Sequence, residues 1–195
     1  MNPKDTVPDK RSGWVAGINR LLLYFSGLAV GRAQSGARDW DVAGHSIAAI
    51  VASAAAIEAT VGEYLAYPKN QNLFAAEIEE WRKGLPRAYE VIKTIVRKTT
   101  GRDVGTLVWY DRMRCLFELR NLFVHYRPQI RAVGTFPDEI TDCIRKHALV
   151  PSGDDSMDWT SRLLVPDVAA QSAAIAQAAI DGFLDEVERR GLTSA

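Results

Sequence analysis

The sequence predicts an all-α fold, and three observations carry this prediction. Apolar residues recur at helical spacing along almost the whole chain, and no stretch of four or more residues alternates like a strand. Proline and glycine separate the periodic segments into helix-length pieces. At 195 residues the chain can bury one core but is short for two ordinary domains. We therefore expect a single up-and-down bundle of four to five long helices with short additional helices.

The N-terminal part should contain a tail followed by the first long helix. Residues 1–11 hold two prolines and five charged residues with few apolar anchors, which predicts a flexible tail, so the domain proper should span 12–195. A helix is expected at about 13–34. Its apolar run looks like the centre of a signal peptide, but Asn19 and Arg20 interrupt it, so we interpret it as a core helix.

The second helix is expected at about 42–67, ended by Pro68. It is rich in alanine, and small side chains let neighbouring helices approach closely, which favours a central position in the bundle. The alanine-rich stretches 48–59 and 169–179 are each shorter than a bilayer span or interrupted by polar residues. The sequence therefore predicts no membrane helix and no membrane partner.

The middle of the chain should form a broken helix and then a long one. Residues 72–99 predict one broken helix or two short ones, with Gly84 and Pro86 at the break and Gly101 after the last turn. A second helix should run from about 104 to 126, where Pro128 stops it.

The C-terminal third should add a short helix and a long one. The short helix is expected near 137–149, and the polar segment 151–159 has the composition of a loop. A long alanine-rich helix should follow at about 169–190, with Asp167 as its N-cap.

The two cysteines, Cys115 and Cys143, are too few for a disulfide framework, and their spacing is not that of a metal-binding pair. A reducing cytoplasm is therefore the expected location. The three histidines also lack zinc-ligand spacing, so we expect neither a metal nor a cofactor.

The charge is unevenly distributed, although the net charge is zero. Lys and Arg number 7 against 9 Asp and Glu in residues 1–81, 12 against 4 in 82–131 and 5 against 11 in 132–195. The basic third would attract a polyanion such as RNA. Alternatively, its cations form a solvated face that pairs with the acidic C-terminal third.

The helix predicted at 104–126 carries a narrow polar stripe. At about 100° per residue, its polar members fall within about 80° of one another. They are Asp111, Arg114, Glu118, Asn121 and His125. Arg120 instead lies on the apolar side, where an unpaired guanidinium would be costly. It must bind a carboxylate, for which Glu58 is the first candidate and Glu63 the second, or open onto a cleft or a subunit interface.

Arg120, Asn121 and His125 close this apolar helix in the order Arg-Asn-x-x-x-His. The arrangement resembles the signature of the HEPN superfamily (higher eukaryote and prokaryote nucleotide-binding), whose members are small helical bundles that include many metal-independent ribonucleases. The resemblance implies a HEPN-like fold and an endoribonuclease of the toxin or defence type. It also implies a homodimer in which two motifs meet in one composite cleft. A dimer is expected as well because the helix is apolar around most of its circumference.

The resemblance assigns a role to each of the three residues. His125 would exchange protons with the 2′-hydroxyl or the leaving oxygen, and Arg120 would clamp the phosphate. Asn121 would orient the imidazole or bind the RNA backbone. The products would be a 2′,3′-cyclic phosphate and a 5′-hydroxyl. Substrate-binding or supporting roles are expected for Arg114, Glu118, Tyr126, Arg127 and Glu58.

One position departs from a branch of this superfamily. Some of its toxins carry a tyrosine two positions after the motif histidine, which a partner antitoxin modifies with AMP. Arg127 occupies that position here, while Tyr126 directly follows His125. This departure argues against partnership with such an antitoxin, although Tyr126 is a candidate acceptor or base-stacking residue. An antitoxin or other regulatory protein is kept as a candidate partner. Two other functions stay open: a non-catalytic interaction module that binds nucleotide, nucleic acid or protein, and a purely structural helical protein.

Overall fold

The computed structural model describes residues 18–35, 39–84, 86–125, 135–146, 148–151 and 158–188. Within these ranges the regular structure is helical and contains no strand, which confirms the all-α prediction. The predicted tail at 1–11 lies outside them. The elements are α2 (Ile18–Ser35), α3 (Asp39–Ala66), α4 (Pro68–Leu73), α5 (Ala75–Lys83), α6 (Ala88–Thr100), the 3-10 helix η1 (Val104–Thr106), α7 (Val108–Val124), α8 (Asp138–Arg145), α9 (Trp159–Leu163) and α10 (Pro166–Glu188).

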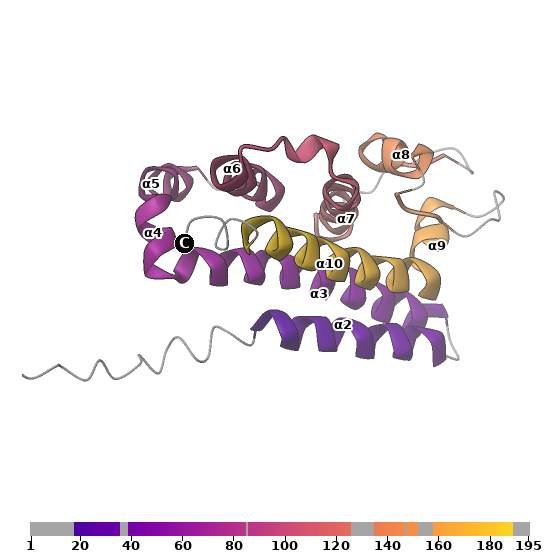
Figure 1. Cartoon of the computed structure of the whole chain (residues 1–195). Coiled ribbons are helices and arrows are strands. Elements are labelled where there is room, and N and C mark those ends of the chain that lie inside the picture. Colours follow the sequence, from indigo (N-terminus) through magenta and orange to yellow (C-terminus); the bar gives the residue numbers. More distant parts are fainter. Residues whose placement is uncertain are drawn as a thin grey trace, which may run out of the picture.

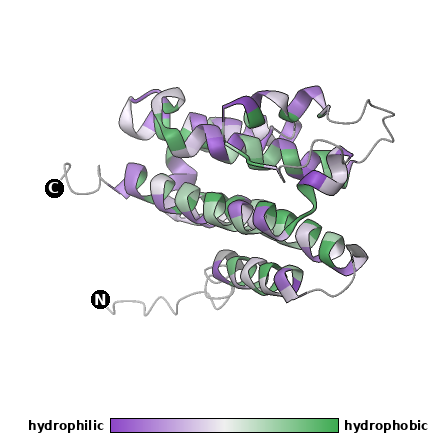
Figure 2. Ribbon diagram, turned by 90° about the vertical axis from the view of Figure 1, so that its right-hand side faces the viewer, coloured by the Kyte–Doolittle hydropathy of each residue, from purple (hydrophilic) through white to green (hydrophobic). Residues whose placement is uncertain are grey.

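The helices form two layers that cross each other. In Figure 1, α2, α3 and α10 run along the length of the molecule, whereas α6 and α7 lie above them and are seen more nearly end-on. Helix α3 contacts α2, α10 and α7, and α10 contacts both layers. Apolar residues dominate the lower layer, while the upper layer is more polar (Figure 2). The long helices α3 and α10 of the lower layer therefore pack against α7 in the upper layer.

Helix α3 is the central element, as its alanine content predicts. Ile50, Ala54 and Ile57 are fully or almost fully buried in the main core. Small residues also bring α2 close to α3, where the hydroxyls of Ser26 and Ser53 share a 2.7 Å hydrogen bond.

The length argument against a membrane helix is wrong for α3. Among the described residues, the segment Trp40–Ala66 is long and apolar enough to cross a bilayer by length and composition. The prediction counted only the alanine-rich stretch, whereas the folded helix extends beyond it on both sides. A core helix passes the same test, and α3 lies between α2, α7 and α10.

Several helix ends follow the signals in the sequence, and one does not. Gly101 adopts the left-handed conformation after α6 (φ 71°), as expected for a C-terminal glycine. Tyr67 separates the end of α3 from Pro68, which begins α4. The prediction that Asp167 caps the last helix is wrong, because α10 already begins at Pro166 and Asp167 lies in its first turn. Part of the predicted loop 151–159 also belongs to a helix, since α9 begins at Trp159.

A single disulfide joins the two cysteines, which the sequence did not predict. Cys115 on α7 and Cys143 on α8 form a disulfide, with their Cα atoms 5.6 Å apart. Two cysteines 28 residues apart give no sign in the sequence that α8 folds back onto α7. Disulfides persist mainly in oxidising compartments, so the cysteine content no longer favours a reducing cytoplasm.

Candidate functional site

Helix α7 positions all three motif residues. It begins after η1, at Val108, and the backbone N–H of its C-cap residue His125 donates to the carbonyl oxygen of Asn121 at 2.9 Å. Its apolar side faces the core through Met113, Leu116 and Leu119, which are fully buried. The packing fixes the rotation of the helix and hence the directions of its polar side chains. The predicted supporting residues Tyr126 and Arg127, and Pro128, lie outside the described residues.

Arg120 binds Glu58, as the sequence predicts. A terminal N–H of Arg120 donates to Oε1 of Glu58 on α3, and the side chains of the two residues are 22% and 42% exposed. The guanidinium also lies 5.7 Å from the centre of the Phe117 ring. Glu63, the second candidate, is not the partner of Arg120; it makes other interactions. An arginine on the apolar side of α7 is thus held by a carboxylate and a ring.

Asn121 connects the arginine with the end of the helix. Nη1 of Arg120 donates to Oδ1 of Asn121 at 3.0 Å, and the backbone carbonyl oxygen of Asn121 accepts the backbone N–H of His125. Asn121 is half-buried, whereas His125 is exposed. The imidazole of His125 makes no hydrogen bond with any other described residue. Arg120 and Asn121 are therefore joined through their side chains at the α3–α7 contact, and His125 stands apart from them in solvent.

Arg120 keeps N–H groups that are not used by Glu58 or Asn121 and that can bind an anion. A guanidinium carries five N–H groups, and the contacts with Glu58 and Asn121 use one on each terminal nitrogen. The ion pair is partly exposed, so solvent already screens it and a phosphate could compete for the same cation. The site can thus offer a cation, an amide and an exposed base within about one and a half turns at the end of the helix.

Glu118 is engaged by helix α6 and its N-cap. Nη1 of Arg87 donates to Oε1 of Glu118 at 3.1 Å and to the hydroxyl of Tyr89 at 2.6 Å. The predicted supporting residue Glu118 is therefore drawn toward α6, whereas Arg120 points to α3. Neither Arg87 nor Tyr89 was expected at the site, because a contact between residues 31 positions apart has no periodic signal in the sequence.

Next to this group, burial raises the pKa of Tyr110 to about 12, and its hydroxyl donates to the backbone oxygen of Tyr89 at 3.1 Å. Tyr110 therefore stays protonated and holds α6 against α7.

Arg114, the other predicted supporting residue, lines a shallow pocket of about 200 Å³ between α7 and α8. The disulfide forms part of its wall, and its charged lining mixes signs. The charged residues are Asp111, Arg112, Arg114, Asp142 and Lys146. A neighbouring pocket lies between α7 and α10 beside Trp109. Neither pocket is lined by Arg120, Asn121 or His125. Arg114 is thus not brought to the three motif residues by either pocket.

The predicted basic region is only partly neutralised. Lys98 pairs with Glu77, Arg82 with Glu79 and Arg102 with Glu186. Arg102–Glu186 is an ion pair of the kind expected between the basic and the acidic thirds.

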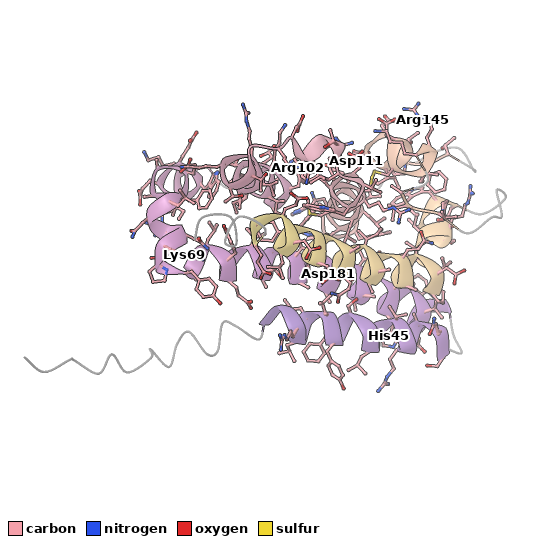
Figure 3. All side chains as sticks on the ribbon, viewed as in Figure 1. His45, Lys69, Arg102, Asp111, Arg145 and Asp181 are labelled. Carbon is pink, nitrogen blue, oxygen red and sulfur yellow. A yellow bond between two sulfur atoms is a disulfide. The ribbon has the colours of Figure 1, made fainter. Side chains whose placement is uncertain are left out.

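The other exposed cations of this region include Lys93, Arg97 and Arg112, which have no ion-pair partner among the described residues. Figure 3 shows many charged side chains projecting from the upper layer, where Arg102 and Asp111 are labelled. Exposed cations without an ion-pair partner are therefore available to an anionic ligand on α6 and on α7.

In the described part of the chain, no group of three or more His, Cys, Asp or Glu residues is placed to hold a metal ion. Comparison with known proteins adds no relative, because no family model, no curated protein and no solved structure matches this chain.

Proposed function

We propose that this protein is a metal-independent endoribonuclease of the HEPN type that cleaves RNA with Arg120, Asn121 and His125. The observation that carries the proposal is the placement of three side chains at the end of α7. The guanidinium of Arg120 donates to the side-chain oxygen of Asn121, and the exposed His125 follows at the C-cap of the helix. A cation that stays charged, an amide and a titratable base are the groups that RNA cleavage without metal requires.

The chemistry assigns one task to each side chain. An imidazole nitrogen of His125 takes the proton of the 2′-hydroxyl, and the 2′-oxygen then attacks the neighbouring phosphorus. The bond from phosphorus to the 5′-oxygen breaks as that oxygen is protonated. The free N–H groups of Arg120 bind the phosphate oxygens as charge develops on them. The products are a 2′,3′-cyclic phosphate and a 5′-hydroxyl.

A second subunit would complete this reaction. One base and one acid are needed, and each chain offers one histidine at the motif, so a composite cleft between two copies supplies the pair. Within one subunit, α3, α6, α8 and α10 all contact α7. Helices of the same subunit thus cover the apolar surface of α7. The argument for a cleft between two subunits therefore rests on the need for both a base and an acid.

The test is incubation of purified protein with RNA in EDTA. Wild type is expected to give fragments ending in 2′,3′-cyclic phosphate, and His125→Ala should lower the cleavage rate by about 10²–10⁴-fold. His45→Ala is the matched control. His45 lies on α3 beside α2, in the layer that does not contain α7 (Figure 3). The His45→Ala variant should therefore cleave RNA at the wild-type rate. Equal cleavage by wild type and His125→Ala, or none by either, would remove the basis of the proposal.

The second candidate is a non-catalytic interaction module, and the Arg120–Glu58 pair favours it. A guanidinium bound to a carboxylate can be part of the architecture that joins α7 to α3. This function predicts that Arg120→Ala lowers stability or dimerisation and leaves RNA intact. RNA binding with steep salt dependence and without cleavage would support it.

The proposed location is the cytoplasm, where an RNA substrate and an antitoxin or other regulatory protein would be met. The disulfide between Cys115 and Cys143 weighs against a reducing compartment. The redox state of the two cysteines in freshly lysed cells, trapped by alkylation and measured by mass, decides between a reducing and an oxidising compartment. Reduced cysteines support the cytoplasm, and a disulfide supports an oxidising compartment.

A further inference from the structure

Helix α2 exposes an apolar stripe on the side away from the core. Its members follow the spacing i, i+3, i+4, i+7, which places them on one face of a helix. They are Leu21 (51% exposed), Tyr24 (62%), Phe25 (50%) and Leu28 (48%). The opposite face of α2 packs on α3, where Ser26 and Ala33 are buried. We propose that this stripe, the α2 face, is a homodimer surface on which α2 of a second copy packs.

The area of the α2 face matches what a dimer needs. Side chains of this size expose on the order of 200 Å² when free, so the four together leave roughly 400 Å² of apolar surface open. A standard interface buries about 800 Å² per partner, of which about 60% is non-polar. The α2 face thus supplies most of the apolar area of one standard interface. Helix α2 lies at the lower edge of the molecule, with no described element beyond it (Figure 1).

Two glycines make the face suited to another helix. A Cβ atom added at Gly27 or at Gly31 would meet nothing within 4 Å, and both residues are exposed beside the stripe. In an antiparallel pair with Leu28 on the two-fold axis, residue i lies opposite residue 56 − i. Phe25 then fits over Gly31, and Tyr24 lies over Arg32 in a cation–π contact. The surface is therefore complementary to itself.

A lipid surface fits α2 less well than a second copy does. Helices that lie in a membrane interface carry a polar face rich in Lys and Arg. The face of α2 opposite the stripe is instead buried against α3, and the basic residues within α2, Arg20 and Arg32, are both exposed. Anionic lipid would gain little from two such charges.

The α2 contact is separate from the composite cleft of the proposed ribonuclease. Helix α3 has α2 on one side and α7 in the other layer (Figure 1), so pairing through α2 leaves the two Arg120–Asn121–His125 groups on outer faces. The proposal of an α2 dimer is therefore independent of the proposed RNA cleavage, and each can fail without the other.

The test measures molar mass by light scattering during size-exclusion chromatography. Wild type should elute at a multiple of 21.5 kDa, and Leu28→Glu should halve that mass because it buries a charge at the axis. Leu73→Glu, on α4 with similar exposure, is the control that should keep the wild-type mass. Gly31→Leu should also weaken association at least tenfold. Its side chain enters open space within one subunit, so the helix content measured by circular dichroism should stay unchanged.

A cross-link locates the contact directly. Both native cysteines are already bonded to each other, so Leu28→Cys adds the only free thiol. Oxidised Leu28→Cys should run as a covalent dimer on a non-reducing gel, and Leu73→Cys should not. A wild-type monomer at high concentration, or a multimer whose mass Leu28→Glu leaves unchanged, would overturn the proposal. So would a monomer that sediments with phosphatidylcholine vesicles in a Leu28-dependent way, since lipid would then be the occupant.

Discussion

The guanidinium of Arg120 on α7 binds the carboxylate of Glu58 on α3, 62 positions earlier in the chain. The pair joins the two layers and places the motif arginine next to a competitor for phosphate. Glu58 acts on Arg120 as a phosphate oxygen would, so RNA binding at this site requires the guanidinium to share or exchange its partner.

Glu58→Gln should therefore tighten RNA binding. The amide keeps an oxygen for Arg120 but removes the negative charge, and a partly exposed pair is worth up to about 1 kcal/mol. We expect the Kd for RNA to fall about two- to fivefold, measured by fluorescence anisotropy. Glu63→Gln, on the same helix, removes the same charge without touching Arg120 and controls for the net-charge change. Weaker binding by Glu58→Gln than by this control would mean that the carboxylate positions Arg120 for RNA.

Reduction of the disulfide should destabilise the protein. The bond closes a loop of 28 residues between α7 and α8, and chain entropy gives such a loop about 3–4 kcal/mol. Urea unfolding with and without dithiothreitol measures this difference. The variant Cys115→Ala/Cys143→Ala should be less stable than oxidised wild type and insensitive to the reductant. Identical unfolding of wild type in both conditions would show that the bond is absent or contributes nothing.

Gly182→Ala should cost about 1–3 kcal/mol or more of unfolding free energy. A Cβ atom at this position of α10 would lie 2.6–2.8 Å from the indole of Trp109, which is overpacking against a rigid ring. Gly62→Ala on α3 is the matched control, because its Cβ atom would meet open space. It should leave stability unchanged or raise it by up to about 1 kcal/mol.

A double variant isolates the contact between the ring and the glycine. If the clash is the cause, Gly182→Ala should cost much less in a Trp109→Ala background. Equal costs in both backgrounds would contradict the packing described for α7 and α10.

The start of α9 should lose stability in acid. Hydrogen bonds from Ser161 and then Thr160 lower the pKa of Asp158 from 3.8 to about 2. The folded state thus favours the carboxylate, so its contribution is complete above about pH 4 and is lost as the pH falls toward 2. Asp158 is exposed, and after solvent screening we expect about 1 kcal/mol.

Asp158→Asn should flatten this acid-dependent loss between pH 4 and 2 in thermal melts, relative to wild type. Superimposable pH profiles for the two proteins would show that Asp158, the N-cap of α9, is not the cause of the acid-dependent loss.

Local signals in the sequence predict the helices well. Gly101 and Pro68 act within one or two residues, so their effects on helix ends can be read without tertiary structure. The position of Arg120 on the apolar side of its helix also predicts that a carboxylate must come from elsewhere. Glu58 follows because it is a charge on a helix that has to be central.

Contacts that depend on the path of the chain could not be predicted. Cys115 and Cys143 meet because α8 folds back onto α7, and Arg87 reaches Glu118 because α6 lies beside α7. Periodicity describes single helices and contains no information on which of them become neighbours. The start of α10 was misplaced for a local reason, since proline fits the first turn of a helix as well as aspartate fits its cap.

The hydrogen bond between Arg120 and Asn121 also decides the orientation of an amide. Because Oδ1 of Asn121 accepts from the guanidinium, its Nδ2 must point the other way and present two N–H groups. Beyond their mutual hydrogen bond, the remaining N–H groups of Arg120 and the two N–H groups of Asn121 are donors. Such a surface selects oxygen-rich, negatively charged ligands and discriminates against ligands that can only donate hydrogen bonds.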